Sequence, residues 1–144
     1  GETMAISARN QLHVVISDVK IGAVNSLITA KTRGGDVLKA TVTVDSEKTL
    51  DLKAGKEAVF LFKAPNVIIS KGENDLRLSA ANQLKGKITA VKEGAINAEI
   101  DVRTAGGENL SAIVTNSSVK NLALAVGDEV TAIIKATQII VGVK

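Results

Sequence analysis

Runs of β-branched and apolar residues, each bounded by polar positions, follow one another along the chain. Runs of this kind predict β-strands. In the first half of the chain they lie at residues 11–20, 24–32, 37–44, 57–63 and 66–70.

Two connections in this half carry their own signals. Gly34-Gly35 lies between the second and third runs and predicts a hairpin, in which both glycines would supply positive φ. A polar segment between the third and fourth runs predicts a short helix, capped by Ser46 and ended by Gly55.

The same plan occurs twice. A shift of 72 residues aligns the chain with itself without a gap: residues 7–12 fall on 79–84, and 19–25 on 91–97. The second short helix would then be capped by Ser117 or Ser118 and ended by Gly127. This predicts two copies of one domain. We place them at residues 4–70 and 76–144, joined by a polar linker at 71–75.

Five strands with a helix between the third and fourth are typical of an OB-like barrel. We therefore expect an all-β chain with one short helix per repeat, built as two tandem five-stranded OB-like β-barrels. The fourth strand is apolar on both faces at residues 58–62. Either its own helix buries the second face, or another subunit does, and we favour the subunit interface.

Composition excludes several kinds of site. Cysteine is absent, and His13 is the only histidine, so thiol chemistry and multi-histidine metal sites are excluded. Asp36 and Glu108 follow Gly-Gly turns and are interpreted as solvated turn residues rather than a general acid and base. Trp and Tyr are absent, and Phe60 and Phe62 are expected in the core or an interface. Nucleobases would therefore lack aromatic side chains to stack on, and we expect no nucleic-acid binding. Because the candidate acids and the single histidine do not form a catalytic set, we also expect that the protein is not an enzyme.

The net charge of +3 is a mild positive bias that suits a small anionic ligand. The most apolar stretch, 132–143, is interrupted by Lys135 and is shorter than the ~20 residues of a membrane helix. We expect no membrane association and a cytoplasmic location. Residues 1–3 are interpreted as a cloning remnant before Met4, the natural start.

Hydroxyls and cations recur in both repeats at strand ends and turns. A buried oxyanion needs a donor for each lone pair and compensation of its charge. For any single residue a structural role is the alternative, since Ser46 can cap the helix and Lys63 can end a strand in solvent. In the first repeat the set is Ser7, Arg9, Thr43, Ser46 and Lys63, and the second repeat keeps Ser79, Thr115, Ser118 and Lys135 at the matching places.

Three short motifs give this pattern a family resemblance. Ser7-Ala8-Arg9-Asn10, Gly22-Ala23-Val24-Asn25 and Lys63-Ala64-Pro65-Asn66-Val67, in this order, resemble the Mop or molbindin family of molybdate-binding domains. The tandem repeat is similar to the di-Mop form. Related TOBE segments occur in molybdate-responsive regulators and importer ATPases. We expect a free-standing binder for storage, buffering or delivery. The alternative is a structural or nucleic-acid-binding OB-fold protein with vestigial anion sites.

The resemblance implies barrels that assemble through their interfaces, here as a trimer of two-barrel chains. It implies molybdate or tungstate as ligand, with molybdenum present only as the oxyanion and no organic cofactor. The main site would use Ser7, Arg9, Thr43, Ser46, Lys63 and Ala64, with Ser79, Thr115, Ser118, Lys135 and Ala136 in the other repeat. A second kind of site, near a threefold axis, would use Gly22, Ala23, Val24 and Asn25, with Gly94, Ala95, Ile96 and Asn97.

The second repeat departs from this pattern twice. Ala81 replaces Arg9, and Thr137 replaces Pro65. Loss of a guanidinium removes a charge and up to five donors. We therefore expect unequal sites.

Overall fold

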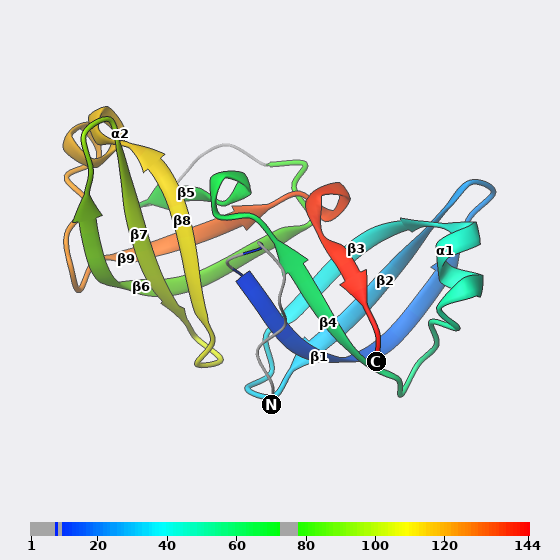
Figure 1. Cartoon of the computed structure of the whole chain (residues 1–144). Coiled ribbons are helices and arrows are strands. Elements are labelled where there is room, and N and C mark those ends of the chain that lie inside the picture. The colour runs from blue at the N-terminus through cyan, green and yellow to red at the C-terminus, as the bar shows by residue number, and fades with distance from the viewer. Residues whose placement is uncertain (1–7, 9, 73–77) are drawn as a thin grey trace.

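The computed structural model describes residue 8, residues 10–72 and residues 78–144. These residues form two curled five-stranded sheets with a short helix in each repeat (Figure 1), which confirms the expected fold class. The first repeat contains β1 (Asn10–Ile21), β2 (Asn25–Thr32), β3 (Val37–Thr43), α1 (Val44–Thr49), β4 (Glu57–Phe62), η1 (Ala64–Asn66) and β5 (Ile68–Lys71). The second contains β6 (Asn82–Glu93), β7 (Asn97–Thr104), β8 (Asn109–Thr115), α2 (Asn116–Asn121), β9 (Glu129–Ile134), η2 (Ala136–Gln138) and β10 (Ile140–Gly142).

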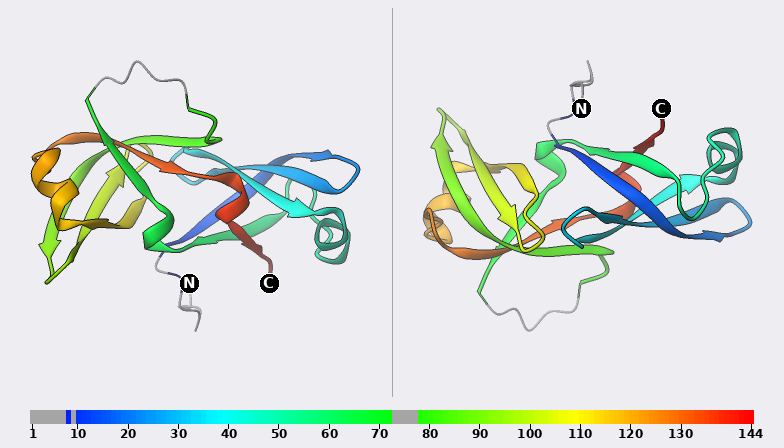
Figure 2. Two further views of the ribbon diagram at one scale, coloured as in Figure 1. Left: turned by 90° about the horizontal axis from the view of Figure 1, so that it is seen from above. Right: turned by 90° about the horizontal axis from the view of Figure 1, so that it is seen from below.

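The two repeats exchange their last strands. One sheet has the order β10-β4-β1-β2-β3, and the other has the order β5-β9-β6-β7-β8. Ile140 pairs with Leu61, and the equivalent Ile68 pairs with Ile133. Both strands cross between the sheets in Figure 2. The division at 4–70 and 76–144 is therefore a division of the sequence, and each sheet contains strands from both sides of it.

One hydrophobic core runs through both sheets. Alternate residues of β1 and β6 enter it, and Phe60 and Phe62 of β4 are 0% and 1% exposed, which confirms a core position for both. Val59 and Leu61 lie outside this cluster but are buried within the single chain as well. The doubly apolar pattern of β4 is thus accounted for without a second subunit, and it is no evidence for an oligomer.

The two Gly-Gly hairpins meet where the sheets pack together. Gly35 has φ +93°, as a tight turn requires. Gly34 is not in that region, so the expectation of two positive φ angles was wrong. A Cβ on Gly34 would lie 1.6 Å from the Gly106 carbonyl oxygen, so this glycine allows the close approach of the hairpins.

Helix capping differs from the sequence prediction. Thr43 caps α1 and Thr115 caps α2, each accepting a hydrogen bond at 3.1 Å from the backbone N–H of Ser46 or Ser118. Neither helix extends to the glycine expected to end it. The chain leaves α1 through Asp51 at φ 52° and α2 through Ala123 at φ 48°, and Gly55 and Gly127 serve the next turn.

Candidate oxyanion-binding site

Two buried asparagines, Asn10 and Asn82, connect the first strand of each repeat to the other repeat through hydrogen bonds. The Asn10 side chain donates to the Ser111 carbonyl at 2.9 Å and accepts from the Ser111 N–H at 2.8 Å. Asn82 makes the equivalent pair with Lys39, at 2.8 and 2.7 Å. Ser111 lies on β8 and Lys39 on β3, which are edge strands of the two sheets. Each asparagine amide therefore makes the two backbone hydrogen bonds that a neighbouring strand would otherwise make. The beginning of β1 therefore lies on β8, and the beginning of β6 lies on β3.

The lysine turns, Lys63–Ala64 and Lys135–Ala136, follow directly from this arrangement. Phe62, just before Lys63, pairs with Asn10, and η1 packs against β8. Ile134, just before Lys135, pairs with Asn82, and η2 packs against β3. Both lysines are exposed, while Ala64 is buried and Ala136 is half-buried. Each lysine turn thus lies at the contact between repeats, with its ammonium group available to a ligand.

The hydroxyl pairs, Thr43–Ser46 and Thr115–Ser118, have the same local structure in both repeats. The two hydroxyl oxygens of each pair lie 2.9 Å apart. A hydroxyl has one proton and two lone pairs, so the two side chains together can still form hydrogen bonds with solvent or a ligand. Thr43 and Thr115 thus have a structural role, because each caps the N-terminus of a helix.

The hairpin tips, residues 22–25 and 94–97, lie beside the hydroxyl pairs. Asn25 pairs with Thr43, and Asn97 pairs with Thr115. Within the first tip, the Gly22 N–H donates to the Asn25 carbonyl at 2.9 Å, so this donor is already used. The apolar tip residues Val24 and Ile96 are 73% and 76% exposed.

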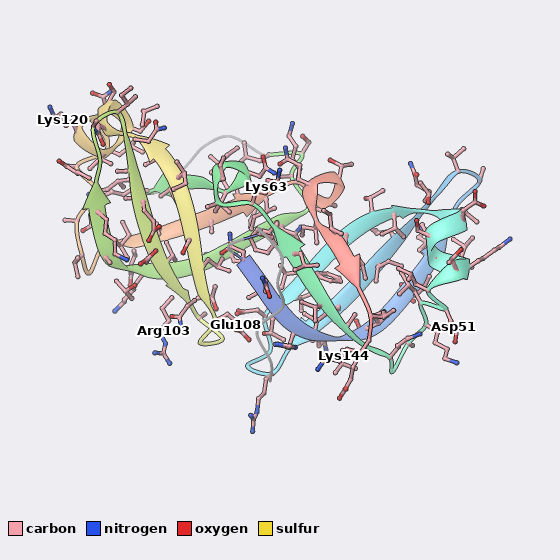
Figure 3. All side chains as sticks on the ribbon, in the orientation of Figure 1. Asp51, Lys63, Arg103, Glu108, Lys120 and Lys144 are labelled. Carbon is pink, nitrogen blue, oxygen red and sulfur yellow. The ribbon has the colours of Figure 1, made fainter. Side chains whose placement is uncertain are left out.

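The structure separates residues that the resemblance assigns to one site. In Figures 1 and 2, α1 and α2 lie at opposite ends of the molecule, whereas η1 and η2 lie near its middle. Lys63 is labelled close to η1 in Figure 3, well away from α1. One chain therefore provides central clusters around the lysine turns and end clusters that join each hydroxyl pair to its hairpin tip.

Several expected site residues need separate comment. Ser7 and Arg9 lie outside the described residues. Ser79 is exposed, and so are Ala81 and Thr137, the two positions where the second repeat departs from the first. The inequality expected from Ala81 stays a prediction.

Asp36 is a residue whose role the sequence did not reveal. Its carboxylate accepts hydrogen bonds from the Thr104 hydroxyl and from the Gly106 N–H, the latter at 3.1 Å. It was expected to be a solvated turn residue, but it ties one hairpin to the other. Asn10 and Asn82 likewise hold the repeats together, and only their equivalent positions in the two repeats could have indicated this.

Electrostatic perturbation is found away from these clusters. The Lys71 ammonium group lies 2.9 Å from the Asp128 carboxylate and lowers the pKa of that carboxyl, helped by the Ala125 N–H. Hydrogen bonds to Glu99 and Asp101 raise the pKa of Lys92. The described residues contain no group of three or more acidic or histidine side chains placed to hold a metal ion. No helix in the described part of the chain is long and apolar enough to span a bilayer.

Comparison with known proteins gives one family. The TOBE domain model matches residues 6–69 and again residues 78–141. A solved structure of the cytoplasmic molybdate-binding protein ModG, with molybdate bound, superimposes with a TM-score of 0.95 and 41% identity. The superposition includes 98% of this chain and 100% of the ModG chain.

Curated relatives have related names. The molybdenum transport protein ModE of Herbaspirillum seropedicae is 34% identical over 99% of this chain, and the molybdenum-pterin-binding protein MopA of Rhodobacter capsulatus is 34% identical over 96%. The chain spans about half the length of these two, 53% and 52%. A probable molybdenum-pterin-binding protein of Haemophilus influenzae is 46% identical over 69 residues, which are all of that protein and 48% of this chain.

Proposed function

Because the chain belongs to the TOBE-domain family in its tandem form, we propose that it binds molybdate. The observation that carries the proposal is the match along the full length of a protein whose structure holds molybdate. The chain's own residues suit an oxyanion, since each repeat places an exposed lysine beside turn backbone and hydroxyl donors near a helix start. We infer storage, buffering or delivery in the cytoplasm as its role, with tungstate as the second ligand. The relatives that match are named for binding or transport, and binding without catalysis is the corresponding proposal here.

A complete site requires more than one chain in this proposal. Lys63 and Ala64 lie in the middle of the molecule, whereas the hydroxyl pair of the same repeat lies at one end. A neighbouring chain would bring its end cluster to the central cluster of the first. Three such chains would close a ring and bring the hairpin tips, with exposed Val24 and Ile96, around a common axis.

Selection for molybdate over phosphate and sulfate follows from the donor set. Phosphate carries a proton near neutral pH, and N–H and ammonium groups cannot accept it; where the site's hydroxyls are already engaged as donors to the anion, an unpaired proton costs about 1–3 kcal/mol. Sulfate carries no proton, so its smaller size and longer contacts to fixed donors must exclude it. Tungstate shares the size and charge of molybdate and is not excluded.

Calorimetric titration with molybdate tests the site. We expect the variant Lys63→Ala/Lys135→Ala to bind about tenfold more weakly or worse, because a charge-assisted hydrogen bond is worth about 1.5–3 kcal/mol. The control is Lys48→Ala/Lys120→Ala, which removes the same charge from exposed, repeat-equivalent positions on α1 and α2. Equal affinity in the lysine-turn variant and the wild type would remove both lysines from the site.

The structural alternative makes opposite predictions. A scaffold with vestigial sites would retain no molybdate in equilibrium dialysis, and a trimer would be unnecessary. Native mass spectrometry should give about three times the chain mass of 14.9 kDa. A clean monomer at micromolar concentration would contradict assembly.

A further inference from the structure

The outward face of the second sheet carries a cationic trough that the oxyanion sites do not use. We use the name outer trough for the hollow of about 910 Å³ whose polar lining residues include Lys85, Lys87, Arg103, Glu129 and Thr131. None of the oxyanion-site residues that the structure describes lines it. It therefore needs an explanation of its own.

Strand register places its side chains in two rows. Lys87 lies opposite Arg103 on β7 and opposite Glu129 on β9. Two residues earlier, Lys85 lies opposite Thr131, which in turn pairs with Ser70 on β5. Since alternate residues of a strand share a face, both lysines project on the same side. The small residues Ser70, Gly72 and Ala105 also line the outer trough, and Val126 adds apolar surface to it.

The described residues form no ion pair with the cations of the outer trough. Among residues 10–72 and 78–144, the lysines in salt bridges are Lys53, Lys71 and Lys92. Lys85, Lys87 and Arg103 are exposed, and in Figure 3 the Arg103 side chain projects away from the ribbon. Of the described residues that line the trough, three are cationic and Glu129 alone carries a carboxylate, so their charges sum to +2. Such a surface attracts an anion.

The first sheet has a counterpart at the same place. A hollow of about 620 Å³ is lined by Lys31 and Glu57, the repeat equivalents of Arg103 and Glu129. Its other cations, Arg33, Lys56 and Lys144, have no cationic repeat equivalent lining the outer trough. A basic hollow thus occurs on this face in both repeats, although different residues supply most of its charge.

Size decides the class of occupant. A volume of about 910 Å³ lies within the 300–1,000 Å³ typical of sites for small organic molecules, and it far exceeds what one tetrahedral oxyanion fills. We propose that the outer trough binds an organic phosphate of about nucleotide size. Its phosphate would contact Lys85, Lys87 and Arg103, and its body would lie on the trough's apolar and backbone surface. This inference stands apart from molybdate binding, because the two use different residues.

Flavin mononucleotide is a suitable probe, because the chain has no Trp or Tyr, the side chains that quench flavin fluorescence on contact. Fluorescence anisotropy on the full chain should show saturable binding below about 1 mM. Riboflavin, which lacks the phosphate, and inorganic phosphate, which lacks the organic body, should each bind at least about tenfold more weakly. Saturation with molybdate should leave flavin mononucleotide binding unchanged.

The test variant is Lys85→Ala/Lys87→Ala/Arg103→Ala, which should weaken flavin mononucleotide binding at least about tenfold. Its charge-matched control is Lys48→Ala/Lys53→Ala/Lys120→Ala, whose lysines are exposed and outside the trough. A cooperative thermal unfolding transition at a Tm close to that of the wild type shows that the test variant is folded, whether or not molybdate binds.

Four results would overturn the proposal. They are absence of binding, equal binding of riboflavin, equal loss in the control variant, and displacement by molybdate. A failure of molybdate binding alone would count against the proposed function and leave the outer trough unaffected.

Discussion

Truncation of Asn82 to alanine tests how the two repeats are joined. The amide of Asn82 is 1% exposed and makes two hydrogen bonds to the backbone of Lys39, at 2.7 and 2.8 Å. Two such bonds contribute about 1 kcal/mol each, and a backbone group left without a partner costs about 1–3 kcal/mol. We expect the free energy of unfolding to fall by about 3 kcal/mol.

Thermal unfolding without oxyanion measures this change, since a ligand would add its own stabilisation. Unfolding entropy of about 2.1 cal/mol/K per residue over 144 residues converts 3 kcal/mol to a fall in Tm of about 10 °C. The control is Gln83→Ala, an exposed neighbour whose side chain makes a local bond to the Ala80 carbonyl at 3.2 Å. A Tm for Asn82→Ala close to that of the control would refute this account of the contact between repeats.

Three further outcomes are expected. Gly34→Ala should lower the free energy of unfolding by more than about 2 kcal/mol, because the new Cβ would overlap the Gly106 carbonyl. Denaturant unfolding measures this change, and the control is Gly35→Asn, which places asparagine at a positive φ and should cost less. Asp128→Asn should lower stability at neutral pH. Because the folded pKa of Asp128 is depressed, its contribution is present above the unfolded carboxyl pKa and is lost as pH falls through the folded one, so a difference that persists in acid would contradict it. Arg9→Ala should abolish the tighter class of molybdate sites, whereas Ala81→Arg should strengthen the weaker class; unchanged stoichiometry and affinity in calorimetry would exclude Arg9 from the site.

The strands could be predicted because side-chain alternation decides which face is buried. The run around Val14 became β1, and the 72-residue offset relates every strand pair in the two repeats. The exchange of the last strands could not be predicted. Ile68 and Ile140 occupy equivalent positions in similar segments, so local pattern does not say which sheet either joins.

The sequence indicates which types of residue the candidate site uses, but it does not indicate which of these residues lie together within one chain. Thr43 and Ser46 are both competent helix caps, so sequence alone could not decide between them. Lys63 and Thr43 were assigned to one site, yet within a chain the fold places them in separate clusters. Which site residues lie together depends on contacts between the repeats, such as the hydrogen bonds of Asn10 to Ser111. A single sequence has no pattern that predicts such contacts.

The exchanged strands also bear on why the two repeats share one polypeptide. Either half alone would leave β4 or β9 beside a vacant edge, and β5 or β10 without the sheet that receives it. A chain of one repeat that kept this pairing would have to obtain that strand from a second molecule, at a rate and extent set by protein concentration. Covalent linkage holds the donor close to the acceptor, at an effective concentration in the millimolar range for short flexible connections. Pairing of the sheets in the tandem chain is therefore insensitive to dilution, and expression level would govern only the association of whole chains.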